Sequence, residues 1–170
     1  MMTADKLPDE QATQRVSPEL AARLARGEIT IADLTGLTRE KLYEIADVGF
    51  RLMNSGQLEQ ARAVYSGLVA ASPFDSVFHC HLGAVNLRMG DADEAVKNFD
   101  AALRLNRANV DAFAGRGEAR LNRREFADAI TDLSAAIELD REAKRASTVR
   151  ARALLLALTE AASKPDTPRR

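Results

Sequence analysis

The sequence predicts an all-α protein, on three observations. Its 170 residues include 31 Ala and 20 Leu, which lose little free energy on entering a helix. Proline occurs only at positions 8, 18, 73, 165 and 168, so residues 74–164 can be helical without a proline break. Shifted against itself by 34 residues, the sequence matches in one register over 42–75, 76–109 and 110–143. Each window is expected to form a helical pair, and the pairs to stack into a solenoid.

Aligned positions in the three windows are either small or bulky. The small positions are expected to let the two helices of a pair approach closely. The bulky positions are expected to fill the space beside that contact. The aligned sets are Gly49, Gly83 and Gly117; Ala61, Ala95 and Ala129; Tyr65, Phe99 and Leu133; and Leu68, Ala102 and Ala136.

Turns and helix starts follow from the same alignment. Asp75 and Asn109 directly precede the second and third windows, where an N-cap is expected. Turn signals inside the windows lie at Ser55-Gly56, Gly90-Asp91 and Arg123-Arg124.

The flanks are expected to complete the solenoid at both ends. Ser17, Pro18 and Glu19 have the order of an N-cap, a helix-starting proline and a first-turn acid. In chain order, the predicted segments are a disordered N-terminal tail (1–16), an N-terminal helix with its lead-in (17–37), the three repeats (38–143), a C-terminal capping helix (144–162) and a disordered tail (163–170).

Composition and charge exclude several function classes. The 24 basic and 25 acidic residues give a net charge of −1, without the basic excess that a nucleic-acid binder uses to neutralise phosphates. No nucleic-acid partner is therefore expected. The single cysteine, Cys80, excludes an intrachain disulfide and suits a reducing compartment. The N-terminus lacks the apolar core of a secretory signal, and no apolar run is long enough to span a bilayer. We expect a cytoplasmic protein that does not insert into membranes.

No pattern of catalytic residues stands out. His79 and His81 flank Cys80, but residues two apart on a helix point to different faces and cannot serve one metal or one nucleophile. We expect His79 to be a packing residue, His81 to lie at the surface and Cys80 to act as a small apolar side chain. Gly115-Arg116-Gly117 follows no strand, so it does not fit a nucleotide-binding loop. The sequence predicts a non-enzymatic protein without a catalytic residue, metal or cofactor.

The 34-residue period and its aligned positions resemble the tetratricopeptide-repeat family. Repeat 1 carries the pattern most fully, with Gly49, Leu52, Gly56, Ala61, Tyr65 and Pro73. His79, Arg116 and Arg124 depart from it. The resemblance implies a concave groove that binds peptides and is lined by the first helix of each repeat. Carried over position by position, its lining would be Tyr43, Ala46, Phe50, Met53, Val77, Cys80, Ala84, Leu87, Asp111, Ala114, Glu118 and Leu121.

This predicted lining is apolar in the first two repeats and acidic in the third. Members of the family that bind acidic C-termini of heat-shock chaperones clamp a carboxylate with basic and amide side chains. Here those places hold Ala46, Phe50, Cys80 and Ala84, which disfavours such a role. An extended peptide with a few hydrophobic anchors suits the groove better. Alternatively, part of this face is covered by the protein's own N-terminal segment or by a dimer partner.

The first half of the chain is also similar to the translocator (class II) chaperones of bacterial type III secretion. The similar features are the lead-in from Gly27 to Ala46, the Leu-Tyr start of repeat 1, the Ser-Gly turn and the junction around Phe74. The resemblance implies a cytoplasmic protein that binds hydrophobic translocators without ATP and accepts an extended, proline-containing client segment in its groove. The N-terminal helix would supply a dimer contact or a second client surface.

Two other interpretations stay open from the sequence. One is a generic repeat scaffold that mediates protein–protein interaction in another bacterial assembly. The other is a small enzyme, which would require a turnover that Cys80→Ser abolishes.

Overall fold

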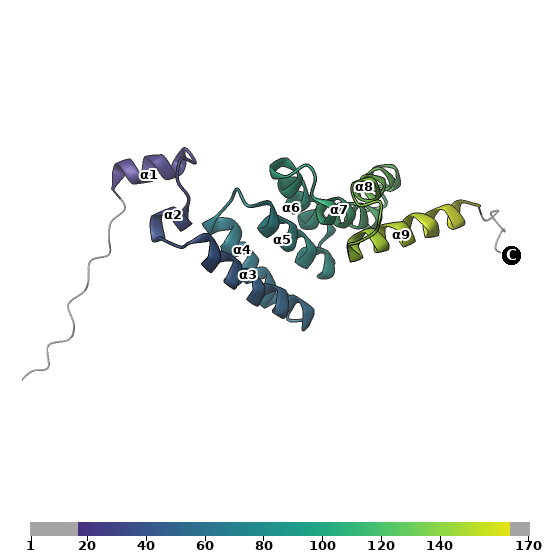
Figure 1. Cartoon of the computed structure of the whole chain (residues 1–170), viewed down its shortest axis with the longest axis horizontal. Coiled ribbons are helices and arrows are strands. Elements are labelled where there is room, and N and C mark those ends of the chain that lie inside the picture. Colours follow the sequence, from purple (N-terminus) through teal and green to yellow (C-terminus); the bar gives the residue numbers. More distant parts are fainter. Residues whose placement is uncertain (1–16, 164–170) are drawn as a thin grey trace, which may run out of the picture.

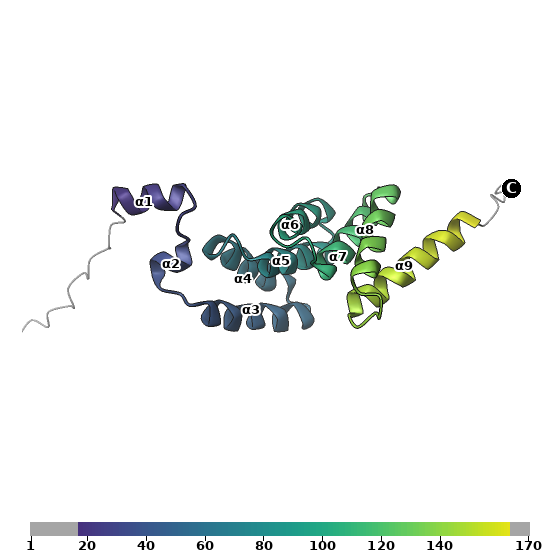
Figure 2. The same cartoon turned by 45° about the horizontal axis from the view of Figure 1, so that its top comes forward.

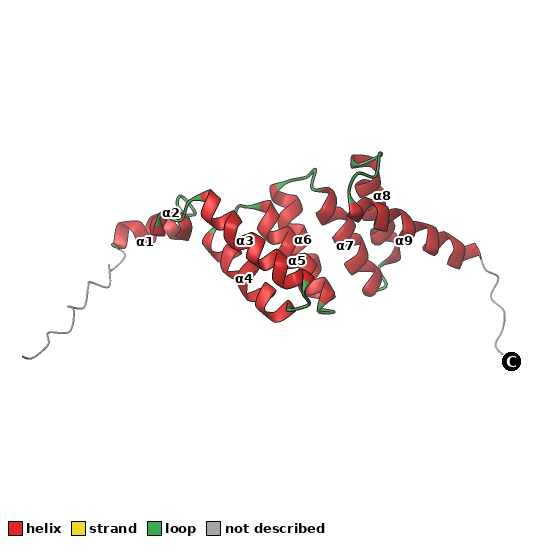
Figure 3. Cartoon of the chain, turned by 60° about the horizontal axis from the view of Figure 1, so that its bottom comes forward, coloured by secondary structure: helices red, strands yellow, loops and turns green. Residues whose placement is uncertain are grey.

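The computed structural model describes residues 17–163. Within that range the chain forms nine helices and no strand, which confirms the predicted fold class (Figures 1 and 3). The helices are α1 (Pro18–Ala25), α2 (Ile31–Thr35), α3 (Arg39–Asn54), α4 (Leu58–Ala71), α5 (Ser76–Arg88), α6 (Ala92–Leu105), α7 (Val110–Asn122), α8 (Phe126–Leu139) and α9 (Ala146–Ser163). Of the expected disordered tails 1–16 and 163–170, residues 1–16 and 164–170 lie outside the described residues, while Ser163 is the last residue of α9.

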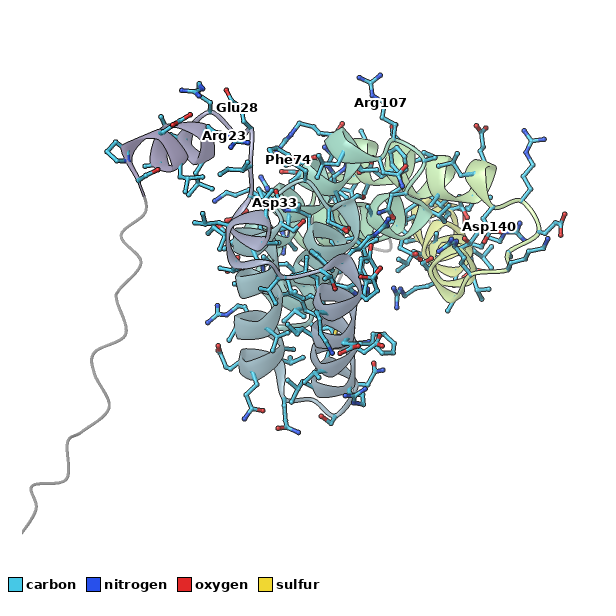
Figure 4. The ribbon with its side chains drawn as sticks, turned by 60° about the vertical axis from the view of Figure 1, so that its left-hand side comes forward. Arg23, Glu28, Asp33, Phe74, Arg107 and Asp140 are labelled. Carbon is cyan, nitrogen blue, oxygen red and sulfur yellow. The ribbon has the colours of Figure 1, made fainter. Side chains whose placement is uncertain are left out.

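The helices form an elongated row of three hairpins, α3–α4, α5–α6 and α7–α8 (Figure 1). Each hairpin packs on the next, and α9 packs against both α7 and α8. The C-terminal half of α9 projects beyond the last hairpin, and α1 stands away from the rest at the opposite end (Figure 2). In Figure 4, Arg23 and Glu28 mark the junction of α1 with the connection to α2, while Asp140 lies beside α9.

The helix boundaries follow the local signals in the sequence. Asp75 accepts a hydrogen bond from the Val77 amide at 2.8 Å, and Asn109 accepts one from the Ala112 amide at 3.0 Å, so both predicted N-caps are confirmed. Ser17 caps α1 in the same way. The lead-in contains a helix that was not expected, α2, which is closed by a capping box between Thr30 and Asp33.

The core explains the alternation of small and bulky positions. A Cβ added at Gly49 would lie 2.9 Å from the ring of Tyr65. One at Gly83 would lie 2.9 Å from Phe99, and one at Gly117 would lie 2.8 Å from Leu133. The three bulky side chains are at most 1% exposed. The small positions on the first helix of each pair therefore leave room for the bulky residue on the second, as predicted.

The third repeat has the same helical hairpin as the first two but differs from them in its turn residue and in its buried charges. Its turn residue Arg124 adopts φ 63°, where Gly56 and Gly90 have φ 78° and 84°. Arg116, which departs from the family pattern, donates two hydrogen bonds to Asp132, at 2.8 and 2.6 Å. It also donates to Asp100 at 2.5 Å. Asp132 is buried, so a charged cluster joins α6, α7 and α8 in this repeat.

Candidate functional site

A cleft of about 370 Å³ lies along the first helices of the repeats and ends against α9. One wall comes from α3 and α5 and is mainly apolar. The other comes from α7 and α9 and is mainly polar. The lining residues are Phe50, Met53, Val77, Cys80, His81, Ala84, Leu87, Arg88, Phe99, Asn109, Asp111, Gly115, Glu118, Asn122, Ala146, Ser147 and Arg150.

Eight of the twelve residues expected to line a groove lie in this cleft. They are Phe50, Met53, Val77, Cys80, Ala84, Leu87, Asp111 and Glu118. Phe50 is 45% exposed and Val77 36%, so each presents apolar surface to solvent. As expected, the residues from the first two repeats are apolar and the two from the third repeat, Asp111 and Glu118, are acidic.

The structure places the other four residues elsewhere. Ala46 is buried beside Tyr65, whose hydroxyl donates to the Ala46 carbonyl at 2.9 Å. Ala114 is buried and Leu121 is partly buried in the core that α9 completes with α7 and α8. Tyr43 lies in a separate hollow near α2, where its hydroxyl donates to Asp75 at 3.0 Å. The lining of the third repeat therefore differs from the carried-over positions, because α9 covers one side of α7.

The position of His81 corrects the sequence expectation. His81 is half-buried at the cleft and does not stand free at the surface: its ring stacks on Tyr65 at 5.0 Å and meets the edge of Phe50 at 6.1 Å. Burial lowers the pKa of His81, and the carboxylate of Asp111 acts in the opposite direction. The signal was present in the sequence, because Val77, His81 and Ala84 have the spacing of one helical face.

The acidic wall is paired with basic residues of α9 and of the loop before it. Arg145 contacts Asp111 at 2.6 Å, and the Ser147 hydroxyl donates to the same carboxylate at 2.5 Å. Arg150 contacts Glu118 at 3.0 Å. Arg145, Ser147 and Arg150 were not among the expected site residues, because no local pattern shows which neighbour a capping helix will touch.

Cys80 has the character of a buried thiol. Burial raises its pKa to about 12, and its sulfur lies 3.9 Å from the Asn109 side-chain oxygen. At neutral pH it is therefore protonated and unsuited to act as a nucleophile. Within residues 17–163, no group of three or more His, Cys, Asp or Glu side chains could hold a metal ion. In that same range, none of the helices has the length and apolar character needed to cross a bilayer.

Curated relatives are similar to the chain over most of its length. Low calcium response locus protein H of Yersinia pestis is 28% identical over 114 residues, which cover 67% of this chain and 68% of that protein. RNA polymerase II-associated protein 3 of Xenopus tropicalis is 25% identical over 136 residues. That match covers 80% of this chain but only 21% of the other, so the chain spans about a fifth of that relative.

Solved structures extend the similarity to the fold. The type III secretion translocator chaperone SycD of Yersinia enterocolitica is 27% identical, with a TM-score of 0.68 over 75% of this chain and 97% of that one. SycD in complex with a peptide of the translocator YopD is 26% identical, with a TM-score of 0.65 over 75% and 98%. The similarity to translocator chaperones that the sequence indicates is therefore confirmed.

The repeats themselves match a family profile. The profile of the tetratricopeptide repeat matches residues 51–109, 82–140 and 115–163, which together cover more than half of the chain. The third match runs through α9, so the capping helix is part of the repeat pattern. The chain belongs to the tetratricopeptide-repeat family.

Proposed function

We propose that this protein is a non-enzymatic chaperone of type III secretion. It binds hydrophobic translocator proteins in the bacterial cytoplasm through the cleft, and keeps them soluble and secretion-competent. The observation that carries the proposal is an open cleft with an apolar wall in a homologue of SycD, which has been solved with a translocator peptide bound. Its mechanism is occlusion: apolar client surface that would otherwise aggregate is buried against the apolar wall.

The apolar wall supplies the anchors for such a client. Phe50 and Val77 stand at the cleft exposed, with Met53, Ala84 and Leu87 beside them. Each apolar Å² that a client covers here has a transfer free energy of about 25 cal/mol, from which the entropy lost on association is subtracted. An extended segment fits a groove of this kind, because its alternate side chains can enter the cleft while its backbone stays near the polar wall.

The experiment combines co-expression with calorimetry. A candidate translocator is co-expressed with the chain, and its apolar, proline-containing segment is then titrated into folded variants. Phe50→Ala should weaken binding by about 1–3 kcal/mol, as truncation of an interface anchor does. Ala84→Glu should weaken it more, because the bound segment would desolvate an unpaired carboxylate.

The control is Phe126→Ala, which removes a 52% exposed ring on α8 outside the cleft lining. Its affinity should equal that of the parent protein. Thermal melts of all variants are recorded in parallel. Unchanged affinity in both cleft variants would remove the proposal. A loss of affinity matched by an equal loss of stability would mean that the substitutions act through the core.

A second candidate function is an adaptor that binds an acidic peptide in another assembly. The observation that keeps it as a candidate is the similarity to RNA polymerase II-associated protein 3, because a repeat domain of RPAP3 has been solved with the HSP90 peptide SRMEEVD, which is acidic at its C-terminal end. The two arginines of the cleft lining, however, are already engaged. Arg88 donates to the Met53 carbonyl at 3.0 Å, and Arg150 pairs with Glu118. Titration with an acidic C-terminal peptide separates the two functions, since the chaperone proposal expects no binding of that peptide.

A further inference from the structure

The apolar wall of the cleft contains one imidazole, that of His81 on α5. The ring stacks on Tyr65 of α4, with the ring centroids 5.0 Å apart. It also meets the edge of Phe50 of α3, with the centroids 6.1 Å apart. These two aromatic neighbours hold the ring in place, while the side chain is half-buried and lines the cleft. His81 is thus a fixed polar group within an apolar binding surface.

The ring nitrogens of His81 have no hydrogen-bond partner within residues 17–163. The other histidine, His79, hydrogen-bonds through Nε2 with the Pro73 carbonyl oxygen at 2.8 Å. In the same range, the buried side-chain nitrogen and oxygen atoms that lack a partner are His79 Nδ1 and Arg120 Nε. The His81 nitrogens are not among these buried atoms, so they are accessible from the cleft.

The other polar side chains that line the cleft have partners among the described residues, apart from Asn122. Asn122 is exposed at the end of α7, where water can satisfy its amide. The partnered side chains are Arg88, Asn109, Asp111, Glu118, Ser147 and Arg150. His81 is therefore the half-buried polar group that a ligand in the cleft would have to satisfy.

Covering this ring without offering it a hydrogen bond is unfavourable. A polar group that loses its water and gains no partner weakens binding about 5- to 100-fold. A neutral imidazole has one N–H donor and one acceptor nitrogen. The main chain of an extended segment carries an N–H and a C=O at every residue except proline, which lacks the N–H, and these groups are not paired within the segment. Such a segment can therefore satisfy the ring where it crosses His81.

We propose that His81 forms a hydrogen bond with a main-chain peptide group of the client, and that this bond sets which residues of the client lie on the apolar wall. The inference rests on the proposed function and adds a specificity-determining residue to it. Apolar client side chains cover Phe50 and Leu87, while the residue that crosses His81 turns its backbone toward the ring. A helical client segment would not fit, because its interior peptide groups are already paired. His81 therefore selects an extended segment.

The hydrogen bond makes client binding depend on pH. Burial lowers the pKa of His81, and the Asp111 carboxylate on α7 acts against this shift. A client that covers the ring removes the water that solvates its charged form, so the complex favours the neutral ring still more. The affinity should therefore be constant while His81 is neutral, and it should fall as the pH drops through the pKa of His81.

Other titratable groups surround the ring, so the test needs a variant without the imidazole. Burial raises the pKa of Tyr65 and that of Cys80 to about 12, so neither side chain changes its charge at mildly acidic pH. The titratable and charged groups around His81 and Tyr65 are Asp47 on α3, Tyr65 itself on α4, Cys80 and Arg88 on α5, Asp111 and Glu118 on α7, Arg145 before α9 and Arg150 on α9.

Isothermal titration calorimetry of the full chain with an apolar, proline-containing translocator segment tests the hydrogen bond. His81→Phe keeps an aromatic ring on Tyr65 but removes both nitrogens. It should raise the dissociation constant about 5- to 100-fold, although the wall becomes more apolar. A ring that served only to fill space would give equal or tighter binding in this variant. The matched control is His79→Phe, outside the cleft lining, which should leave the dissociation constant unchanged. Thermal melts verify that each variant is folded.

Two further measurements identify the client group. Replacing one peptide bond of the segment at a time by an ester removes one N–H donor and weakens one carbonyl acceptor. One such ester should weaken binding to the parent protein and leave binding to His81→Phe unchanged. From neutral to mildly acidic pH, the parent should lose more affinity than His81→Phe.

Each outcome separates the two proposals. Unchanged or tighter binding by His81→Phe would overturn the role of His81 and leave the chaperone proposal intact. The same ester sensitivity and the same pH dependence in both proteins would do so as well. A parent protein that binds no translocator segment would overturn both proposals.

Discussion

The first two repeats and the third repeat share one backbone plan but are held together differently. Repeats 1 and 2 place an aromatic ring, Tyr65 or Phe99, against the small position of the paired helix. Repeat 3 places the smaller Leu133 there and adds the charged cluster of Arg116 and Asp132. A loss of apolar filling is thus accompanied by an ionic link between neighbouring helices. The repeat geometry depends on filling the space and satisfying the polar groups, and it does not require one set of side chains.

The same contrast shapes the cleft. The first two repeats supply Phe50, Val77 and Leu87, while repeat 3 and α9 supply Glu118 paired with Arg150. In the proposed complex, the apolar wall would bury the apolar side chains of the client. The charges of Glu118 and Arg150 offset each other on the polar wall, which would offer donors and acceptors to the client backbone. Substitutions in repeats 1 and 2, compared with substitutions in repeat 3, therefore test how much each part contributes to stability and to binding.

The largest expected effect is the loss of the buried carboxylate in repeat 3. Asp132→Ala leaves Arg116 and Arg120 without the carboxylate that both contact, at 2.6 and 2.7 Å. Removing one partner of a buried ion pair costs about 3–5 kcal/mol. Urea denaturation measures the free energy of unfolding. The matched control is Asp100→Ala, which removes the more exposed partner of Arg116 and should cost about 1 kcal/mol or less. Equal losses in the two variants would contradict the role given to burial.

The next effect tests the tight packing in repeat 2. Ala95 is fully buried, so Ala95→Leu should overpack the helical pair and reduce the free energy of unfolding by about 1–3 kcal/mol. Ala63→Leu, on the exposed side of α4, is the control and should change stability little. An unchanged urea midpoint for Ala95→Leu would show that the pair can open to accept the leucine.

Much of the fold was predictable, because its causes are local or periodic. Turn residues, N-caps such as Asp75, and the small position Gly83 opposite Phe99 all repeat at 34 residues, so the sequence alone places them. The partner of Arg116 was not predictable. Asp132 lies 16 residues away on the next helix, and nothing in the period says that a charge on one helix will meet a charge on the other.

The candidate site was largely predictable on the apolar wall and only in part on the polar one, where Asp111 and Glu118 were expected but their basic partners were not. Helical spacing from Phe50 and Val77 collects Met53, Cys80, Ala84 and Leu87. It also collects Tyr43 and Ala46, which lie outside the cleft. The polar wall depends on how α9 docks after Ala143, whose φ of 52° turns the chain. That docking buries Ala114 and brings Arg150 to the cleft, and it is a tertiary event without a local signature.

A pH dependence is expected from the apolar wall. The pKa of His81 is lowered in the folded protein, so the unfolded chain binds a proton more readily and stability falls as the pH drops below the ordinary histidine value of about 6.5. His81→Phe keeps an aromatic ring beside Tyr65 and should flatten this loss. Thermal melts between neutral and mildly acidic pH compare the two proteins. The same pH dependence in parent and variant would show that another group is responsible.

The smallest effect concerns the turn between the two helices of each repeat. Here repeat 3 carries the backbone strain, because it has an arginine where repeats 1 and 2 have glycine. Arg124 adopts a left-handed conformation that Gly56 and Gly90 adopt at the same point of their repeats. This conformation costs a residue with a side chain about 1–2 kcal/mol, and glycine avoids that cost. Glycine also gives the unfolded chain more conformational freedom, which lowers the free energy of unfolding by about 0.4–1 kcal/mol. Arg124→Gly should therefore stabilise repeat 3 by about 0.5–1 kcal/mol in net terms. Gly90→Ala should destabilise repeat 2, since it introduces the strain that Arg124 carries, and urea midpoints of the two variants should move in opposite directions. If Arg124→Gly lowers the midpoint, then the arginine side chain contributes more to the folded state than its backbone strain takes away.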